Sequence, residues 1–120
     1  SIELDIPSFK AAAKAGPETV DGFSICAFAV TKEDEISISV RSGVVSPLGH
    51  PIEDPATGSA SGALGGLLRR GRTNDDFTVN ITQGVEMGRP SQITVTIPKG
   101  EDRSYVAGKC ISVANGVLTL

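Results

Sequence analysis

One short stretch near the middle of the chain decides its fold. It reads Glu53-Asp54-Pro55-Ala56-Thr57-Gly58-Ser59-Ala60-Ser61-Gly62-Ala63-Leu64. An Asp-Pro turn leads through Thr, Gly and Ser into small uncharged residues, which is the pattern of a helix start. Because the first turn of a helix exposes backbone N–H groups, this stretch places a carboxylate and several hydroxyls around a position suited to an anion.

We expect the helix to run from about residue 57 to residue 70. Its apolar positions follow the helical spacing, and they are Ala60, Ala63, Leu64, Leu67 and Leu68. The opposite face carries serine and glycines in place of charges, which predicts a helix that is buried all round. Each internal glycine costs about 1 kcal/mol relative to alanine, so strands wrapped closely around the helix are expected to compensate. Basic residues and Gly71 mark its end.

Segments that alternate apolar and polar residues predict strands on both sides of this helix. Residues 22–30 and 36–41 are predicted to form a hairpin around the charged turn at 32–35, and residues 44–54 a loop. Further strands are predicted at 77–81 and 93–97, and a last hairpin pairs 105–113 with 117–120 around Asn115-Gly116. A short peripheral helix is expected over residues 7–15, between Pro7 and Gly16-Pro17.

Composition excludes several classes of function. With 120 residues, of which 39% are hydrophobic, the chain is expected to form one domain over residues 1–120. The net charge of -3, one Tyr and no Trp argue against nucleic-acid binding. No apolar run approaches the ~20 residues that cross a bilayer, so we expect no membrane partner and a cytoplasmic location. Cys26 and Cys110 lack the spacing of metal or redox sites, so we expect no metal and two buried free thiols.

Three motifs occur in a characteristic order along the chain. They are Glu53 to Ala60, then Gln83-Gly84-x-x-Met87-Gly88-Arg89-Pro90-Ser91, then Val106-Ala107-Gly108-Lys109 with the closing residues 115–120. Together they resemble the PhzF-like phenazine-biosynthesis isomerase family, from about Phe23 to Leu120, but only the C-terminal half of the family's pattern.

The resemblance implies an α+β fold of the diaminopimelate-epimerase kind. Each half of such a protein is a mostly antiparallel, β-barrel-like sheet wrapped around a central helix, and the active site lies in the cleft between the two halves. The first half, which supplies the family's principal catalytic Glu and a His, is absent from these 120 residues. The resemblance also implies proton transfer without a cofactor.

By the resemblance, Asp54 matches an active-site aspartate that holds and polarises the substrate. The competing interpretation is that Asp54 only organises the turn before Pro55. The N–H groups and hydroxyls of Thr57, Gly58 and Ser59 are expected to bind a substrate carboxylate. Here the competing interpretation is ordinary N-capping of the helix.

Five other side chains, two of them cysteines, are weaker candidates. We interpret Glu53 as a structural partner for a basic group, since adjacent residues in a turn usually point apart, and Arg89 as part of a structural salt bridge. His50, the only histidine, is expected to be a solvated loop residue. A racemase that uses two cysteines is disfavoured, because Asp54-Pro55 stands where the related epimerases carry one of their cysteines.

These observations favour one function and leave a second open. The first is the C-terminal half of a cofactor-independent isomerase or epimerase that moves a proton on a small carboxylate substrate. Its partner is the missing N-terminal half or a second copy of the chain in a homodimer. The second is a non-catalytic module for carboxylate binding or dimerisation, because no residue of this half is an obvious proton-transfer base.

Overall fold

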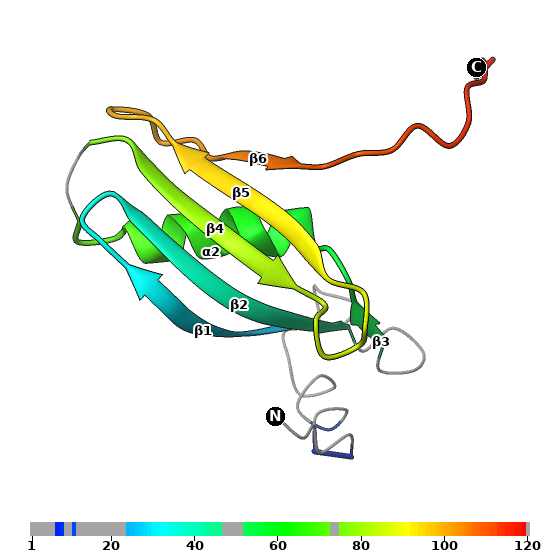
Figure 1. Cartoon of the computed structure of the whole chain (residues 1–120), viewed down its shortest axis with the longest axis horizontal. Coiled ribbons are helices and arrows are strands. Elements are labelled where there is room, and N and C mark those ends of the chain that lie inside the picture. Colours follow the sequence, from blue (N-terminus) through cyan, green and yellow to red (C-terminus); the bar gives the residue numbers. More distant parts are fainter. Residues whose placement is uncertain (1–6, 9–10, 12–23, 47–51, 73–74, 120) are drawn as a thin grey trace.

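The computed structural model describes residues 7–8, 11, 24–46, 52–72 and 75–119. Its described core is one sheet with the helix α2 packed against one face, behind the sheet in the view of Figure 1. The elements, in chain order, are β1 (Ile25–Glu33), β2 (Ser37–Ser46), β3 (Ile52–Asp54), α2 (Gly58–Arg69), β4 (Phe77–Gln83), β5 (Ser91–Ile97) and β6 (Tyr105–Gly108). The predicted α+β class is confirmed.

The sheet is mixed and open. Its strand order is β1-β2-β4-β5-β6, and β3 pairs with β2 beside this path. Every neighbouring pair is antiparallel except β2 and β4, which run parallel because the chain crosses over through β3 and α2 between them. Among the described strands β1 and β6 remain edges, so the expected barrel-like wrapping is not found there.

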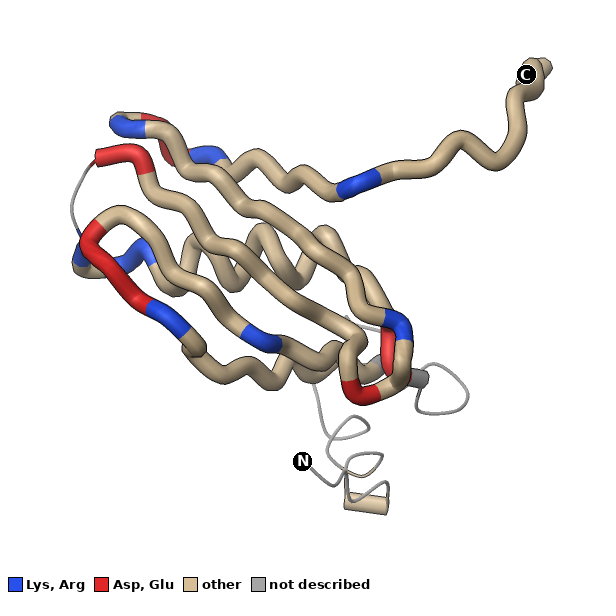
Figure 2. The backbone as a smooth tube through the Cα atoms, in the orientation of Figure 1, with Lys and Arg blue, Asp and Glu red and all other residues tan. Residues whose placement is uncertain are grey.

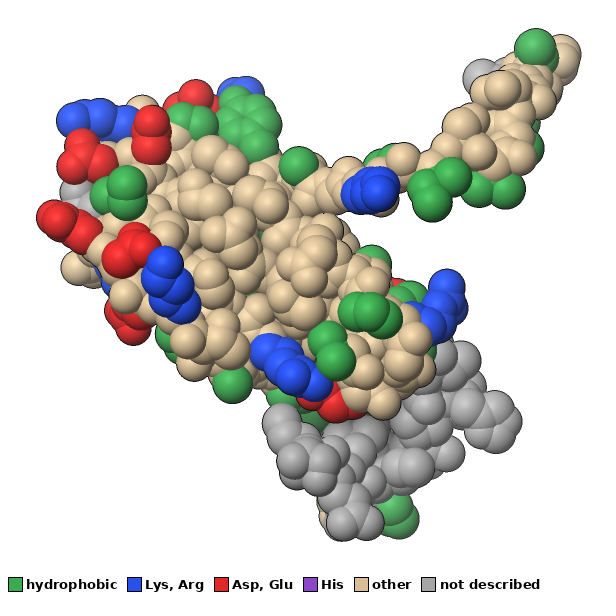
Figure 3. Space-filling model, in the orientation of Figure 1, with side chains coloured by type: hydrophobic (Ala, Val, Ile, Leu, Met, Phe, Trp, Pro, Cys, Tyr) green, Lys and Arg blue, Asp and Glu red, His purple; other side chains and the backbone are tan. Residues whose placement is uncertain are grey.

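The core lies between the sheet and α2. Alternate residues of the central strands face the helix, since successive side chains in a strand point to opposite faces. The buried apolar residues of this layer are Ile38, Val40, Leu64, Phe77, Val79, Ile81, Ile93, Val95 and Ile97. The opposite face of β4 and β5 carries mainly Thr, Asn and Gln, and it is largely tan in Figure 3. The alternation therefore determines which face of each strand meets the helix.

The predicted bounds of α2 are confirmed to within one residue at each end. Thr57 is its N-cap and Gly71 follows its end with a φ of 75°, the left-handed conformation expected of a glycine there. The expectation that the helix is buried all round is wrong. Only one face meets the sheet, and Leu67 on the other side remains 54% exposed. A sheet on one side of a helix covers only that side.

Two predictions for the segments around the core are also wrong. The stretch predicted as a loop over 44–54 continues β2 to Ser46 and forms β3, because the alternation of β2 extends through Val44. The predicted C-terminal hairpin is not found among the described residues: β6 ends at Gly108, and residues 109–119 leave the sheet without regular structure (Figure 1). An Asn-Gly turn pairs its flanks only where they also gain burial, and none of the described elements accompanies this segment.

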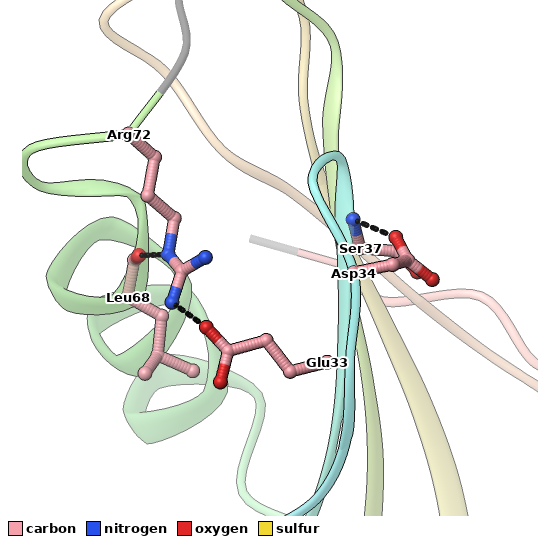
Figure 4. Close-up of polar contacts among 5 residues, drawn as sticks. All are labelled: Glu33, Asp34, Ser37, Leu68 and Arg72. Atoms are coloured by element: carbon pink, nitrogen blue, oxygen red, sulfur yellow. Dashed lines mark hydrogen bonds and ion pairs between the residues drawn. The ribbon is translucent and has the colours of Figure 1, made fainter.

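Charged residues occur mainly in and near the turns at the ends of the sheet (Figure 2). At one end, the guanidinium of Arg72 donates to the carbonyl oxygen of Leu68 (2.7 Å) and pairs with Glu33, which ties the end of α2 to β1 (Figure 4). In the β1–β2 turn, Asp34 accepts hydrogen bonds from the backbone N–H (2.8 Å) and hydroxyl (2.9 Å) of Ser37. These contacts join the corner where β1, β2 and α2 meet.

Some expectations fall partly or wholly outside the described residues. Pro7, Ser8 and Ala11 are helical, while the rest of the predicted helix over 7–15 lies outside them, as does His50. Within the described part of the chain, no helix is long and apolar enough to cross a membrane.

Candidate functional site

The register along β2 brings two strand ends together. Residue 54 at the end of β3 pairs with Val44, and residue 83 at the end of β4 pairs with Ser42, only two positions away on the same strand. Because β1 occupies the other side of β2, β3 and β4 share one side and their C-terminal ends meet. The turn that leads into α2 therefore starts directly beside Gln83.

Asp54 organises this turn. Its Oδ2 accepts a hydrogen bond from the hydroxyl of Thr57 (2.7 Å), and its Oδ1 accepts one from the backbone N–H of Ala56 (3.3 Å). The side chain is half-buried. The turn-organising role that the sequence left open is thus present in the structure, and it leaves each carboxylate oxygen a further lone pair for a ligand.

Gln83 is the functional candidate that the sequence analysis missed. Its side chain is 1% exposed, and Nε2 donates to the carbonyl oxygen of Asp54 (2.7 Å) and to the hydroxyl of Thr57 (3.0 Å). Its Oε1 accepts the backbone N–H of Thr57 (3.3 Å). One signal was available in the sequence: position 83 continues the inward alternation of Phe77, Val79 and Ile81 but is polar. A buried polar side chain needs partners, and here the turn supplies them.

Gly84 packs the second motif against the first. Its φ is +75°, and a Cβ there would lie 2.6 Å from the carbonyl oxygen of Arg89 and 3.0 Å from Cα and the carbonyl oxygen of Pro55. The N–H of Arg89 also donates to the carbonyl oxygen of Gly84 (2.9 Å). Only glycine fits this contact, so the Gln-Gly pair and the Asp-Pro pair form one compact structure.

The start of α2 presents donors without partners. The ladder begins with the N–H of Ser61 bonded to the carbonyl oxygen of Thr57, and among the described residues nothing accepts from the N–H groups of Gly58, Ser59 and Ala60. The Thr57 side chain makes no capping bond, since its hydroxyl is bonded to Asp54, so side-chain N-capping by Thr57 is not realised. The first turn holds no acidic residue that would offset the positive end of the helix.

Glu53 and Asp54 point to opposite sides of β3, as expected for adjacent strand residues. Glu53 lies on the face away from α2, where Oε1 is 3.4 Å from the position of a Cβ at Gly43, and it lines a cavity of about 350 Å³ together with Arg41 and Glu86. Arg41 pairs with Glu86 (2.7 Å) rather than with Glu53. Neither the expected basic partner of Glu53 nor the expected salt bridge of Arg89 is found among the described residues, and Arg89 is exposed.

The two cysteines lie on β1 and in the C-terminal segment. Both are free; Cys26 packs against the core, and its burial raises the pKa of the thiol. Cys110 lies exposed in the C-terminal segment, so the expectation that it is buried is wrong. The described residues contain no group of three or more His, Cys, Asp or Glu side chains that could hold a metal ion.

Comparison with known proteins places the chain in a family. Residues 6–116 match the family described as Phenazine biosynthesis-like protein, so the chain belongs to the PhzF-like proteins and the resemblance noted from its motifs is confirmed.

Its curated relatives are longer isomerases. An uncharacterized isomerase of Pasteurella multocida is 44% identical over 71 residues, which are 58% of this chain and 24% of that protein. The trans-2,3-dihydro-3-hydroxyanthranilate isomerase of Pseudomonas chlororaphis is 37% identical over 84 residues, which are 67% of this chain and 30% of the relative. An uncharacterized isomerase of Mesorhizobium japonicum is 41% identical over 93 residues, or 73% of this chain and 30% of the relative. The chain thus matches less than a third of each; no solved structure matches it significantly.

Proposed function

We propose that this chain forms one wall of the active-site cleft of a PhzF-like isomerase, corresponding to the C-terminal half of the family's two-half fold. The isomerase class rests on membership of the family and on relatives that are named isomerases. The observation that carries the proposal is the start of α2, where three N–H groups have no partner among the described residues and directly follow Thr57, whose hydroxyl is bonded to the carboxylate of Asp54. Donors and acceptor of this kind suit a substrate that carries both a carboxylate and a donor group.

In the proposed mechanism, the substrate carboxylate accepts hydrogen bonds from the N–H groups of Gly58 and Ser59. Both residues are exposed, and Gly58 lets the ligand approach the backbone. Asp54 accepts a hydrogen bond from an amine or hydroxyl of the substrate through its remaining lone pairs, and so holds and polarises the substrate. The base that removes the proton comes from the other half of the cleft, and no cofactor takes part.

The other half is either a separate N-terminal segment or a second copy of this chain in a homodimer. Exposed apolar side chains support the need for a partner. Phe28 and Val30 on the edge strand β1 are 40% and 45% exposed, and Val113 in the C-terminal segment is 93% exposed. The length of the relatives also supports a partner segment, because each is more than three times as long as the stretch that it shares with this chain.

The alternative is a module that binds carboxylates without catalysis. It is favoured by the surroundings of Asp54, whose hydrogen-bond partners among the described residues are Thr57, Ala56 and Gln83, none of them an acid or a base. Binding and turnover must therefore be measured separately.

A two-part experiment separates these functions. The first part titrates the ¹⁵N-labelled chain with 3-hydroxyanthranilate and follows the amide resonances of Gly58 and Ser59. The second part follows deuterium uptake from D₂O into trans-2,3-dihydro-3-hydroxyanthranilate, for this chain and for the whole gene product that contains it. Shifts with exchange support the isomerase, shifts without exchange in either protein support the binding module, and neither shifts nor exchange overturn both.

Asp54→Asn is the test of the site itself. It is expected to lower the exchange rate by about 100-fold, in the range for loss of a group that stabilises charge in the transition state. The matched control is Asp102→Asn, in an exposed turn, which should leave the rate unchanged. Equal rates for the wild type and Asp54→Asn would remove Asp54 from the mechanism.

A further inference from the structure

The hydrogen bonds of Gln83 have a direction that follows from the chemistry of its partners. The carbonyl oxygen of Asp54 only accepts and the backbone N–H of Thr57 only donates, so Nε2 and Oε1 of Gln83 cannot exchange places. Because Nε2 also donates to the hydroxyl of Thr57, the single hydroxyl proton is directed to Oδ2 of Asp54. A directed chain of hydrogen bonds thus runs from Gln83 through Thr57 to the carboxylate.

Among the described residues, all hydrogen-bond partners of this carboxamide lie in the turn that enters α2. The inward positions before it on β4 are Phe77, Val79 and Ile81, and an apolar residue at position 83 would fill the same layer without the cost of burying an amide. In the part of the chain that the structure describes, the buried amide is compensated by the backbone of Asp54 and by Thr57 alone. Its hydrogen bonds therefore act on the geometry of the turn and not on the packing of the sheet.

We propose that Gln83 is a positioning residue that sets the orientation of the Asp54 carboxylate relative to the free N–H groups at the start of α2. The inference rests on the proposed function and deepens it, because it names the group that fixes the position of the Asp54 carboxylate relative to the N–H groups of α2. Gln83 acts through Asp54 and Thr57, since its own side chain is buried away from any ligand.

The test compares Gln83→Met, which keeps the length of the side chain but removes its hydrogen bonds, with Gln92→Met as a matched control. Gln92 lies exposed on β5, and its carboxamide accepts a hydrogen bond from Thr82 (3.2 Å). Amide hydrogen exchange reports local order at Thr57 and global stability at Val79 and Val95. Titration with 3-hydroxyanthranilate, followed at the amides of Gly58 and Ser59, reports the geometry of the site.

In Gln83→Met, we expect exchange at Thr57 to accelerate by about tenfold, and the dissociation constant of 3-hydroxyanthranilate to rise by about tenfold, as expected for lost buried hydrogen bonds. Exchange at Val79 and Val95 should change far less than exchange at Thr57, and Gln92→Met should match the wild type. Unchanged exchange at Thr57 with unchanged affinity would overturn the proposal. An equal acceleration at Thr57, Val79 and Val95 would also overturn it, because it would make Gln83 a packing residue.

Gln83→Glu provides a second, independent readout. The introduced carboxylate can still accept the N–H of Thr57 but cannot donate to Asp54 or to the Thr57 hydroxyl. On acidification the introduced carboxyl group gains one O–H donor. The exchange rate at Thr57 in the variant should therefore fall toward the rate of the wild type measured at the same pH. Absence of any such recovery would contradict the hydrogen-bonding role.

This design separates the two proposals. If neither binding of 3-hydroxyanthranilate nor deuterium exchange is found for the wild type, the proposed function fails for this class of ligand. Exchange at Thr57 in Gln83→Met and Gln83→Glu still decides whether Gln83 orders the turn.

Discussion

Gly65 on α2 lies so close to Val95 on β5 that a Cβ at residue 65 would be 2.6 Å from Cγ1 of Val95. At this contact the backbone of the helix packs directly against the sheet. The close approach explains why one of the three internal residues of α2 that are glycine has no side chain. Gly66, the next residue, has no neighbour within 4 Å of a Cβ position. Substitution of the two adjacent glycines by alanine is therefore expected to change the stability of the fold in opposite directions.

Gly65→Ala is expected to destabilise the fold by about 1–3 kcal/mol, since the added methyl group overpacks the contact with Val95. Gly66→Ala is the matched control and should stabilise the fold by about 0.5–1 kcal/mol, because alanine loses less conformational entropy in a helix. Urea unfolding followed by circular dichroism measures both. Equal effects of the two substitutions would contradict the close approach at Gly65.

Gly84→Ala should destabilise the turn that carries the site by more than Gly88→Ala does. Both glycines have a positive φ, so both substitutions bear the left-handed strain of about 1–2 kcal/mol. Only the Cβ at residue 84 would also collide with the backbone of Pro55 and Arg89. The free energies of unfolding of the two variants test this difference, and a larger loss for Gly88→Ala would show that the contact with Pro55 does not constrain the turn.

Asp34 should make the stability of the β1–β2 turn depend on pH. The hydroxyl of Ser37 holds the pKa of this carboxyl below its usual value, assisted by backbone N–H groups and by Lys32. A lowered pKa in the folded state means that the contribution is complete above about pH 4, the usual range of an aspartate, and is lost as the pH falls through the folded-state value.

Asp34→Ala should therefore be less stable than the wild type at pH 7, with a difference that shrinks toward pH 2. Denaturant midpoints at both pH values measure it, with Asp102→Ala as the control in another exposed turn. A difference that grows in acid would have the wrong sign for this mechanism.

The C-terminal segment should contribute to association rather than to the stability of the sheet. Four of its apolar side chains are 79–95% exposed: Ile111, Val113, Val117 and Leu118. Replacing all four with serine should leave the free energy of unfolding of a dilute chain within about 0.5 kcal/mol of the wild type. Sedimentation velocity should show weaker self-association, or weaker binding to the N-terminal half. A clear loss of stability in the isolated chain would instead show that these residues pack on the sheet.

Much of the core was predictable because it depends on local periodicity. The alternation at 36–41, 77–81 and 93–97 identifies β2, β4 and β5, and the small-residue run after Asp54-Pro55 identifies α2 nearly to the residue. The N-cap at Thr57 and the glycine that follows the end of the helix were also predictable, because both depend on local sequence. The C-terminal hairpin was not, since an Asn-Gly signal says nothing about whether its flanks find a surface to bury.

The sequence by itself determined the family, the helix start and the placement of Asp54 beside it, because these depend on residues that are neighbours along the chain. Only the tertiary structure decided that β3 and β4 end two positions apart on β2, and so that Gln83 reaches Asp54 and Thr57 from 29 and 26 residues away. The tertiary structure also decided that the sheet covers one face of α2. Contacts between distant segments are set by strand register and crossover, and no local pattern encodes them.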